Sequence, residues 1–278
     1  MLSFRLSTLQ AADWAQQAFA DSPLGNRRRS RRAAQLAATL AVHPGLSIPC
    51  LFDSPYDVKA AYALLDRPEA TPERLQRPHR RDVAAQLAVA GRTCLLLEDT
   101  SDLSWSGNLP ISGLGPIGLG RQGQQGFQLH SVLAVVWPQL LPGQVQRPPV
   151  QILGLADQIY HVRAAAPAGK KSAACNARPA ESALWSQAGG HLGPAPAGAR
   201  WERVCDRGAD MFPFLASCRQ LGHGFIVRAA QDRALESGGR LFQAAGQAKV
   251  LGHFELGLRS RPGQAARVVR LAVAAAPV

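Results

Sequence analysis

The sequence predicts an α/β protein in which a helical N-terminal region precedes a mixed sheet with helices packed against it. Up to about residue 90, apolar residues recur at helical spacing between capping residues and turns that contain Pro or Gly. From Thr93 onward the pattern changes to short apolar strands, in the order three strands, helix, strand, helix and strand. This order is typical of a mixed sheet.

The helical region is predicted from its spacing and its caps. A first helix surrounds Trp14 and Phe19, and the segment NRRRSRRAAQLAATLAVHPG (26–45) forms a second with Asn26 as its N-cap. The inward face of this second helix is formed by Ala33, Leu36 and Leu40. A third helix is expected over 54–65. The next begins at the cap Thr71-Pro72-Glu73 and continues to near residue 90.

The second part of the chain is predicted as follows. We expect strands at 93–99, 126–137, 151–162, 201–206 and 224–229. We expect helices at 179–188 and 209–222, and hairpins in the tail at 240–278. The Gly-, Pro- and Ala-rich stretches at 141–149 and 191–199 are interpreted as surface loops.

The charge of the chain indicates a polyanionic partner. The formal net charge is +12 at pH 7, and most of the basic residues are arginines. Nucleic acid is the first candidate and an acidic membrane surface the second, although Arg-rich and Ala-rich usage also reflects a GC-rich genome. No apolar run approaches the roughly 20 residues that a bilayer span requires, so no membrane insertion is expected.

The N-terminus, the cysteines and the serines argue against several classes of protein. Gln10 and Asp13 interrupt the apolar stretch that a signal peptide would need, so we expect a cytoplasmic protein. The five cysteines show no CxxC spacing, which favours buried free thiols over a disulfide framework or a zinc site. Ser101 and Ser104 have no identifiable His or Asp partner, so a serine hydrolase is not expected.

Arginines crowd the first turns of the helix in 26–45. They are Arg27, Arg28, Arg29, Arg31 and Arg32. Cations at a helix N-terminus oppose the helix dipole at a cost of a few tenths of a kcal/mol. A phosphate backbone would favour them there, whereas the alternative is a solvated basic face. If all five contact phosphates, the log–log salt slope of DNA binding would be near about −4.5.

Two acids stand at the ends of predicted strands. Asp99 ends the first strand and Asp206 the strand at 201–206. If these strands are neighbours, the two carboxylates could hold a hard cation such as Mg²⁺. Unmetallated carboxylates about 4 Å apart would repel by roughly 4 kcal/mol at an effective dielectric constant near 20. The alternative is that Asp99 is a solvent-exposed strand end and Asp206 a helix cap.

Short segments in a fixed order through most of the chain carry a family resemblance. They are WAQQAFADSPLGNRRRSRRAAQLA (14–37), HPGLSIPCLFDSPYDVKAAYALLD (43–66), TPERLQRPH (71–79), LLLEDTSDLSWSG (95–107), GLGPIGLG (113–120), GFQLHSVLAV (126–135), ESALW (181–185), CDRGADMF (205–212) and GFIVRAAQDR (224–233). Together they resemble the bacterial DDE transposases of the transposon-five type, within the insertion-sequence-four group. That resemblance implies a helical DNA-binding domain at 1–88, a ribonuclease-H-like core at 89–235 and part of a β-strand insertion at 236–278.

The resemblance also assigns roles to single residues. Asp99 in EDT matches the first catalytic Asp of the family, and Asp206 in CDRGAD matches the second. Glu98 then faces the other side of the strand and is expected to be structural. Gly208 stands where the family has an acid. Arg207 either approaches a DNA phosphate or pairs with Asp210.

A third family acid is a Glu on a helix within a Tyr–Arg–Glu–Lys signature, and we find no counterpart to it. Glu255 in HFELGL lacks that signature and lies in a predicted strand. We therefore expect a truncated cut-and-paste DNA transposase with little or no cleavage activity, which carries two of the three ligands for Mg²⁺ or Mn²⁺. Its implied partners are double-stranded DNA at terminal inverted repeats and a second copy of itself. The alternatives are a non-catalytic DNA-end-binding protein or inhibitor, and an unstable remnant.

Overall fold

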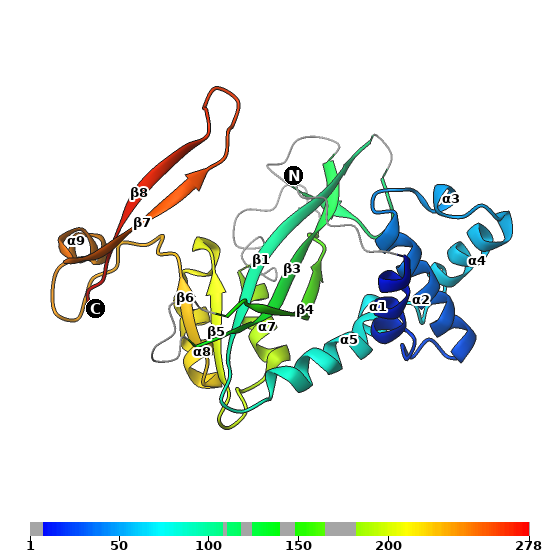
Figure 1. Ribbon diagram of the computed structural model, residues 1–278, viewed down its shortest axis with the longest axis horizontal. Coiled ribbons are helices and arrows are strands. Elements are labelled where there is room, and N and C mark those ends of the chain that lie inside the picture. Colours follow the sequence, from blue (N-terminus) through cyan, green and yellow to red (C-terminus); the bar gives the residue numbers. More distant parts are fainter. Residues whose placement is uncertain (1–7, 108–109, 118–123, 140–147, 165–181, 278) are drawn as a thin grey trace. The chain divides into compact units, whose positions relative to one another are not determined.

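The computed structural model describes residues 8–107, 110–117, 124–139, 148–164 and 182–277. Its contacts divide the chain into two units, Met1–Val227 and Arg228–Val278, which we describe separately (Figure 1). The predicted boundaries near residues 88 and 235 stay a prediction. The predicted helix at 179–188 begins outside the described residues. Residues 141–147 of the loop predicted at 141–149 also lie outside them.

The first part of the larger unit is helical, as predicted. Its helices are α1 (Thr8–Phe19), α2 (Arg27–Val42), α3 (Ile48–Leu51), α4 (Pro55–Leu65) and α5 (Pro72–Leu87). The side chain of Asn26 accepts a hydrogen bond from the amide of Arg29 and so caps α2, and Thr71 caps α5 in the same way. Both predicted caps are therefore confirmed.

A small apolar cluster holds α2 and α4 together. It contains Leu24, Ala33, Leu36, Leu51, Ala61 and Leu64. Ala33 and Leu36 are buried as predicted, but Leu40 is exposed. The cluster extends along α2 only as far as Leu36, so the predicted inward position of Leu40 is wrong.

The strands of the larger unit form one mixed sheet. They are β1 (Thr93–Ser106), β2 (Gly115–Pro116), β3 (Gln124–Trp137), β4 (Gln151–His161), β5 (Arg200–Cys205) and β6 (Gly224–Val227). Their order is β2-β3-β1-β5-β6, with β4 also paired to β3. β3 pairs antiparallel with β1 and β4, while β1, β5 and β6 run parallel. The predicted mixed α/β sheet is confirmed.

One face of this sheet carries the main core. In β1 the side chains of Cys94, Leu96 and Glu98 are buried, and the intervening ones are partly or fully exposed. Helices α5 and α7 (Ala183–Leu192) pack on the buried face through Val83, Leu87, Leu184 and Ala188. Helix α8 (Phe212–Leu221) adds Phe214 and Cys218 beside Cys205 of β5.

A close contact joins α5 to β4. The Nε2 atom of His79 accepts a hydrogen bond from the amide of Leu155 at 3.0 Å. Gly154 has a φ of +125°, and a Cβ built there would lie 2.4 Å from the His79 ring. Only glycine fits this conformation and this approach. The helical region and the sheet are therefore linked by a contact that depends on both residues.

The smaller unit contains a helix and a hairpin. Helix α9 covers Leu241–Gln247, and β7 (Val250–Leu258) pairs antiparallel with β8 (Arg267–Ala274). The hairpin confirms the prediction for this part of the tail, with Glu255 in β7 opposite Arg270. The predicted hairpins at 240–278 are wrong for residues 241–247, where α9 forms, because Leu, Ala and Gln favour helix.

The described cysteines are all free thiols. Cys94, Cys205 and Cys218 are buried free thiols, as predicted, whereas Cys50 is exposed and Cys175 lies outside the described residues. Within the described ranges, no helix combines the length and the apolar character that crossing a membrane would require.

Candidate nucleic-acid interface and carboxylate pair

The arginines at the start of α2 separate into two groups. Arg27, Arg28 and Arg31 are exposed, and no ion pair joins any of them to another described residue. Arg29 and Arg32 are half-buried. The N-terminal turns of α2 therefore present three cations to solvent at the end of the helix where the dipole disfavours them.

Carboxylates of the helical region hold the second group. Arg29 lies 3.3 Å from Glu69 and also donates to the carbonyl oxygen of Leu24. Arg32 lies 2.7 Å from Asp57, and its guanidinium is 5.9 Å from the ring centroid of Tyr56. The backbone amide of Glu69 and then Arg29 lower the pKa of the Glu69 carboxyl, so it stays ionised. These two arginines thus fasten α2 to the segments that follow it.

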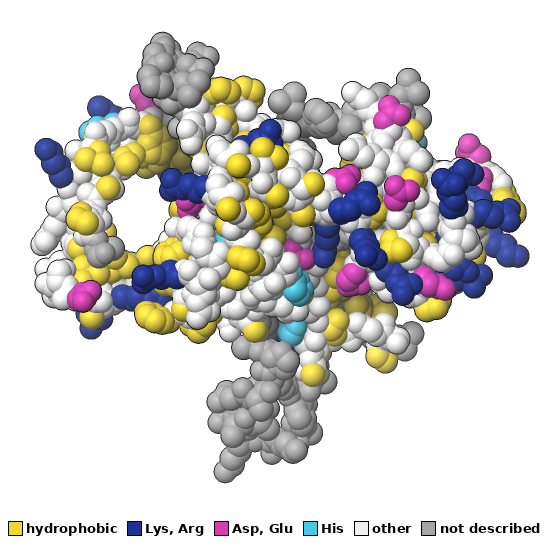
Figure 2. Space-filling model, turned by 90° about the horizontal axis from the view of Figure 1, so that it is seen from below, with side chains coloured by type: hydrophobic (Ala, Val, Ile, Leu, Met, Phe, Trp, Pro, Cys, Tyr) yellow, Lys and Arg dark blue, Asp and Glu magenta, His cyan; other side chains and the backbone are white. Residues whose placement is uncertain are grey.

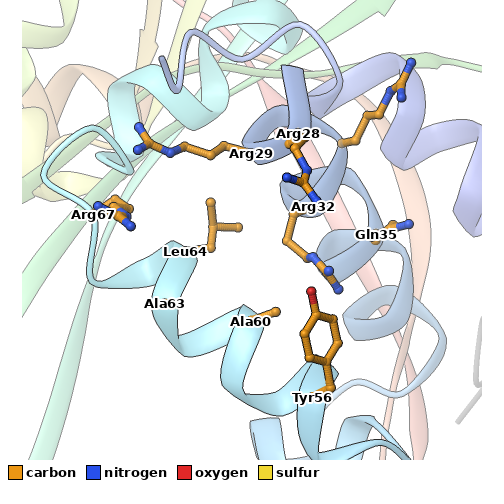
Figure 3. A pocket seen from close by; sticks show the side chains of 10 residues that line it. Arg28, Arg29, Arg32, Gln35, Tyr56, Ala60, Ala63, Leu64 and Arg67 are labelled. Atoms are coloured by element: carbon orange, nitrogen blue, oxygen red, sulfur yellow. The ribbon is translucent and has the colours of Figure 1, made fainter. Parts of the chain in front are cut away.

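A groove of about 460 Å³ lies between α2 and α4 (Figure 3). Arg28, Arg31, Arg32 and Gln35 line it from α2, and Tyr56, Ala60, Ala63 and Leu64 line it from α4. Among the described residues its lining contains no carboxylate. The wall from α4 carries no charge and the wall from α2, which also includes Arg29, carries cations, so the hollow suits an extended anion.

Arg67 completes this groove and was not predicted from the sequence. It follows α4 and is exposed, and it lines the groove together with Arg28 and Arg31. No local pattern marks it, because only the packing of α4 on α2 brings it there. Figure 2 shows the Lys and Arg side chains gathered over the helical part of the larger unit.

The two predicted metal ligands lie where the parallel pairing of β1 and β5 ends, but the predicted strand end at Asp99 is wrong, because β1 continues to Ser106 alongside β3. β1 and β5 pair in parallel, and their last paired residues are Glu98 and Cys205. Asp99 and Asp206 come next on the two strands, and both are exposed. By strand alternation both face away from the buried side of the sheet. The fold therefore brings together two residues that are far apart in the sequence.

Asp206 also caps a short helix. Its Oδ1 atom accepts a hydrogen bond of 2.7 Å from the amide of Gly208 at the start of the 3₁₀ turn η1 (Arg207–Ala209). A Cβ at position 208 would lie 2.9 Å from that oxygen and 3.3 Å from the Trp185 ring. The absence of a side chain at Gly208 thus leaves room for this cap. Arg207 is exposed.

Arg203 supplies the positive charge that meets Glu98 of β1. Glu98 and Arg203 are both fully buried and form a two-pronged ion pair between β1 and β5. Arg203 also donates to the carbonyl oxygen of Trp185 at 2.7 Å, and its guanidinium lies 4.5 Å from the Phe214 ring centroid. The predicted structural role of Glu98, on the face opposite Asp99, agrees with this geometry.

Burial and this ion pair determine the protonation of the groups around it. Burial alone would lower the pKa of Arg203, but the hydrogen bonds and charge of Glu98 outweigh it and raise that pKa. Burial, with a further contribution from Glu98, raises the pKa of the Cys205 thiol far above its ordinary value. Burial also raises the pKa of Cys218. Both thiols are therefore protonated and unreactive at neutral pH.

In the part of the chain that the structure describes, no three or more His, Cys, Asp or Glu side chains are grouped to hold a metal ion. Asp99 and Asp206 are two exposed carboxylates that belong to no such group of described residues. Mg²⁺ commonly has one or two protein carboxylates and fills its other positions with water and substrate phosphate oxygens. An exposed pair of hard oxygen donors fits that preference.

A comparison with known protein families supports the basic surface formed by α2 and α4. Residues 11–70 match the family model described as transposase DNA-binding. The match includes all of α2, α3 and α4 and therefore the groove lined by Arg28, Arg31 and Arg67. It supports a transposase-related chain with a DNA-binding helical region.

Proposed function

We propose that this chain is a DNA transposase polypeptide of the DDE type. Its helical region would bind the ends of a transposable element, and its sheet would present Asp99 and Asp206 to a scissile phosphodiester. One observation carries the proposal: the exposed, unpaired arginines of α2 lie within the segment that matches transposase DNA-binding domains. The transposon-five type, terminal inverted repeats and a synaptic homodimer belong to the proposal through the family resemblance.

The helical region binds the phosphate backbone in this proposal. Arg27, Arg28 and Arg31 have no carboxylate to neutralise them, so a phosphate can do so without breaking an ion pair. Each neutralised phosphate releases condensed counterions, which adds about −0.9 to the log–log salt slope. Three arginines supply about −2.7, and Arg67 at the end of the groove adds to that value.

The carboxylate pair acts on the same DNA. Asp99 and Asp206 would hold Mg²⁺ or Mn²⁺ where the pairing of β1 and β5 ends. The ion, when bound, supplies Lewis-acid stabilisation of charge at a phosphate. The bond between Glu98 and Arg203 holds β1 and β5 in register next to Asp99 and Asp206. Arg207, exposed beside Asp206, is free to contact a phosphate oxygen.

DNA binding is tested by fluorescence anisotropy with a labelled duplex at several salt concentrations. The chain should bind with a steep salt dependence, and the Arg27→Gln/Arg28→Gln/Arg31→Gln variant should lose about 2.7 from the slope. A flat salt response of the unsubstituted chain would remove the proposal.

Metal binding is tested independently of cleavage. Mn²⁺ titration followed by electron paramagnetic resonance should show a site that Asp99→Asn or Asp206→Asn removes. Asp13→Asn, which changes an exposed acid of α1, is the matched control and should leave the site intact. DNA binding without a metal site would support the second candidate function, a non-catalytic protein that occupies or blocks DNA ends.

A further inference from the structure

A second row of arginines lies on α5. Arg74, Arg77 and Arg81 follow one another at i, i+3 and i+7, which places them on one face of the helix. All three are exposed, whereas Arg80 on the adjoining face is half-buried. We call Arg74, Arg77 and Arg81 the α5 row. It begins beyond residue 70 and therefore outside the segment that matches the transposase DNA-binding model.

The arginines of α5 differ in their partners. Arg80 lies 2.9 Å from the buried carboxylate of Asp157 and donates to the carbonyl oxygen of Gln158. Arg81 approaches its sequence neighbour Asp82 at 3.5 Å, an exposed pair of little energetic value. Arg74 and Arg77 form no ion pair with any described residue. Arg80 is therefore structural, and the α5 row leaves its charge to solvent.

The α5 row shares a groove with the start of α2. A hollow of about 590 Å³ is lined by Asn26, Arg27 and Ser30 on one side and by Arg74 and Arg77 on the other. Asp21 is the one carboxylate in its described lining. A second hollow of about 490 Å³ contains Arg77 and Arg81, together with Glu73 and Asp157. Arg77 belongs to both hollows, so the basic surface of α2 continues onto α5.

We infer that the α5 row binds phosphates of the same DNA duplex next to the stretch that α2 contacts. This inference rests on the proposed function and extends its interface beyond residues 11–70. Seven residues of helix span about 10.5 Å. One DNA strand carries a phosphate about every 3.4 Å along the helix axis, so the row can follow about three of them. Phosphate contacts position the protein and do not select a sequence.

The test compares charge-matched variants of the full chain. Arg74→Gln/Arg77→Gln removes two charges from the α5 row. Arg200→Gln/Arg219→Gln removes two exposed arginines from the start of β5 and from α8. The first variant should lose about 1.8 from the log–log salt slope and weaken binding to every duplex sequence equally. The second should differ little from the unsubstituted chain.

Folding and charge are controlled separately. Exposed substitutions of this kind usually change stability by less than about 0.5 kcal/mol, so the melting temperatures should be similar. Arg74→Lys/Arg77→Lys keeps the point charges and should restore most of the slope, and this holds even if the Gln variant is poorly folded. If the Gln variant matches the Arg200→Gln/Arg219→Gln control while the α2 triple variant loses its slope, the α5 inference is overturned and the proposed function stands. If the unsubstituted chain shows no salt-dependent DNA binding, the proposed function itself fails.

Discussion

The helical region and the sheet core use arginine in opposite ways. In the core, Arg203 is fully buried and Glu98 meets its charge within the fold. At the start of α2, Arg27, Arg28 and Arg31 are exposed and no described residue pairs with them. A buried charge must find its partner during folding, because leaving it unpaired is strongly unfavourable. A surface charge without a partner remains available to a ligand, and the difference separates arginines that hold the fold from arginines suited to binding.

The largest expected effect comes from removing the partner in the core. Glu98→Gln leaves the Arg203 charge buried and uncompensated, and should cost about 3–5 kcal/mol of unfolding free energy. Urea denaturation followed by circular dichroism measures this loss. Asp99→Asn changes the exposed neighbour and should cost less than about 0.5 kcal/mol. Equal losses in the two variants would contradict the assignment of Glu98 as the structural acid.

The next largest effect is expected from acidic pH, which should lower the free energy of unfolding. Burial lowers the pKa of His79 and of His223 below the ordinary value of about 6.5. As pH falls through about 6.5, the unfolded chain takes up protons that the folded chain does not, so stability declines. Above that pH the full stability is present. Urea midpoints measured from neutral to acidic pH should show this fall, and a constant midpoint would contradict it.

A smaller loss is expected at the cap of α2. Asn26→Ala removes the acceptor for the amide of Arg29 and should cost about 1 kcal/mol. Asn26→Gly should cost only a few tenths of a kcal/mol, because glycine is tolerated at this position. The two variants are compared by thermal unfolding. If neither variant lowers the melting temperature, the side-chain bond contributes nothing to stability.

The smallest effect on stability separates two arginines of the same helix. Arg32→Ala breaks the pair with Asp57 and should cost about 0.2–1 kcal/mol, whereas Arg31→Ala should be nearly neutral. In DNA binding the order reverses, since Arg31 is the unpaired one and its loss should reduce the salt slope by about 0.9. The same order in both assays would erase the distinction between the two groups of arginines.

Local signals in the sequence predicted much of the fold. The caps at Asn26 and Thr71 were recognisable because a polar side chain before a helical pattern satisfies free amides. The outward direction of Asp99 and the inward direction of Glu98 followed from strand alternation once β1 was recognised. Segment LFQAAGQ was misjudged, because a short apolar run does not distinguish strand from helix.

Partners that depend on packing could not be predicted. Arg203 was not identified as the partner of Glu98, since the contact needs the parallel pairing of β1 and β5. Arg67 enters the groove only through the packing of α4 on α2. The α5 row was not predicted from the sequence, and its continuity with Arg27 required the fold. Sequence reasoning therefore found the chemically distinctive residues and missed those that the tertiary structure adds to them.

The side chains of β1 alternate between the two faces of the sheet, so the register of this strand decides which face each side chain occupies. Loss of one residue before Glu98 would turn every later side chain of the strand to the opposite face of the sheet. Asp99 would then lie under α7 and α8, and Glu98 would emerge into water away from Arg203. Such an indel would exchange the two acids, with the shorter Asp99 opposite Arg203 and Glu98 on the outer face, whereas a point substitution changes either one alone.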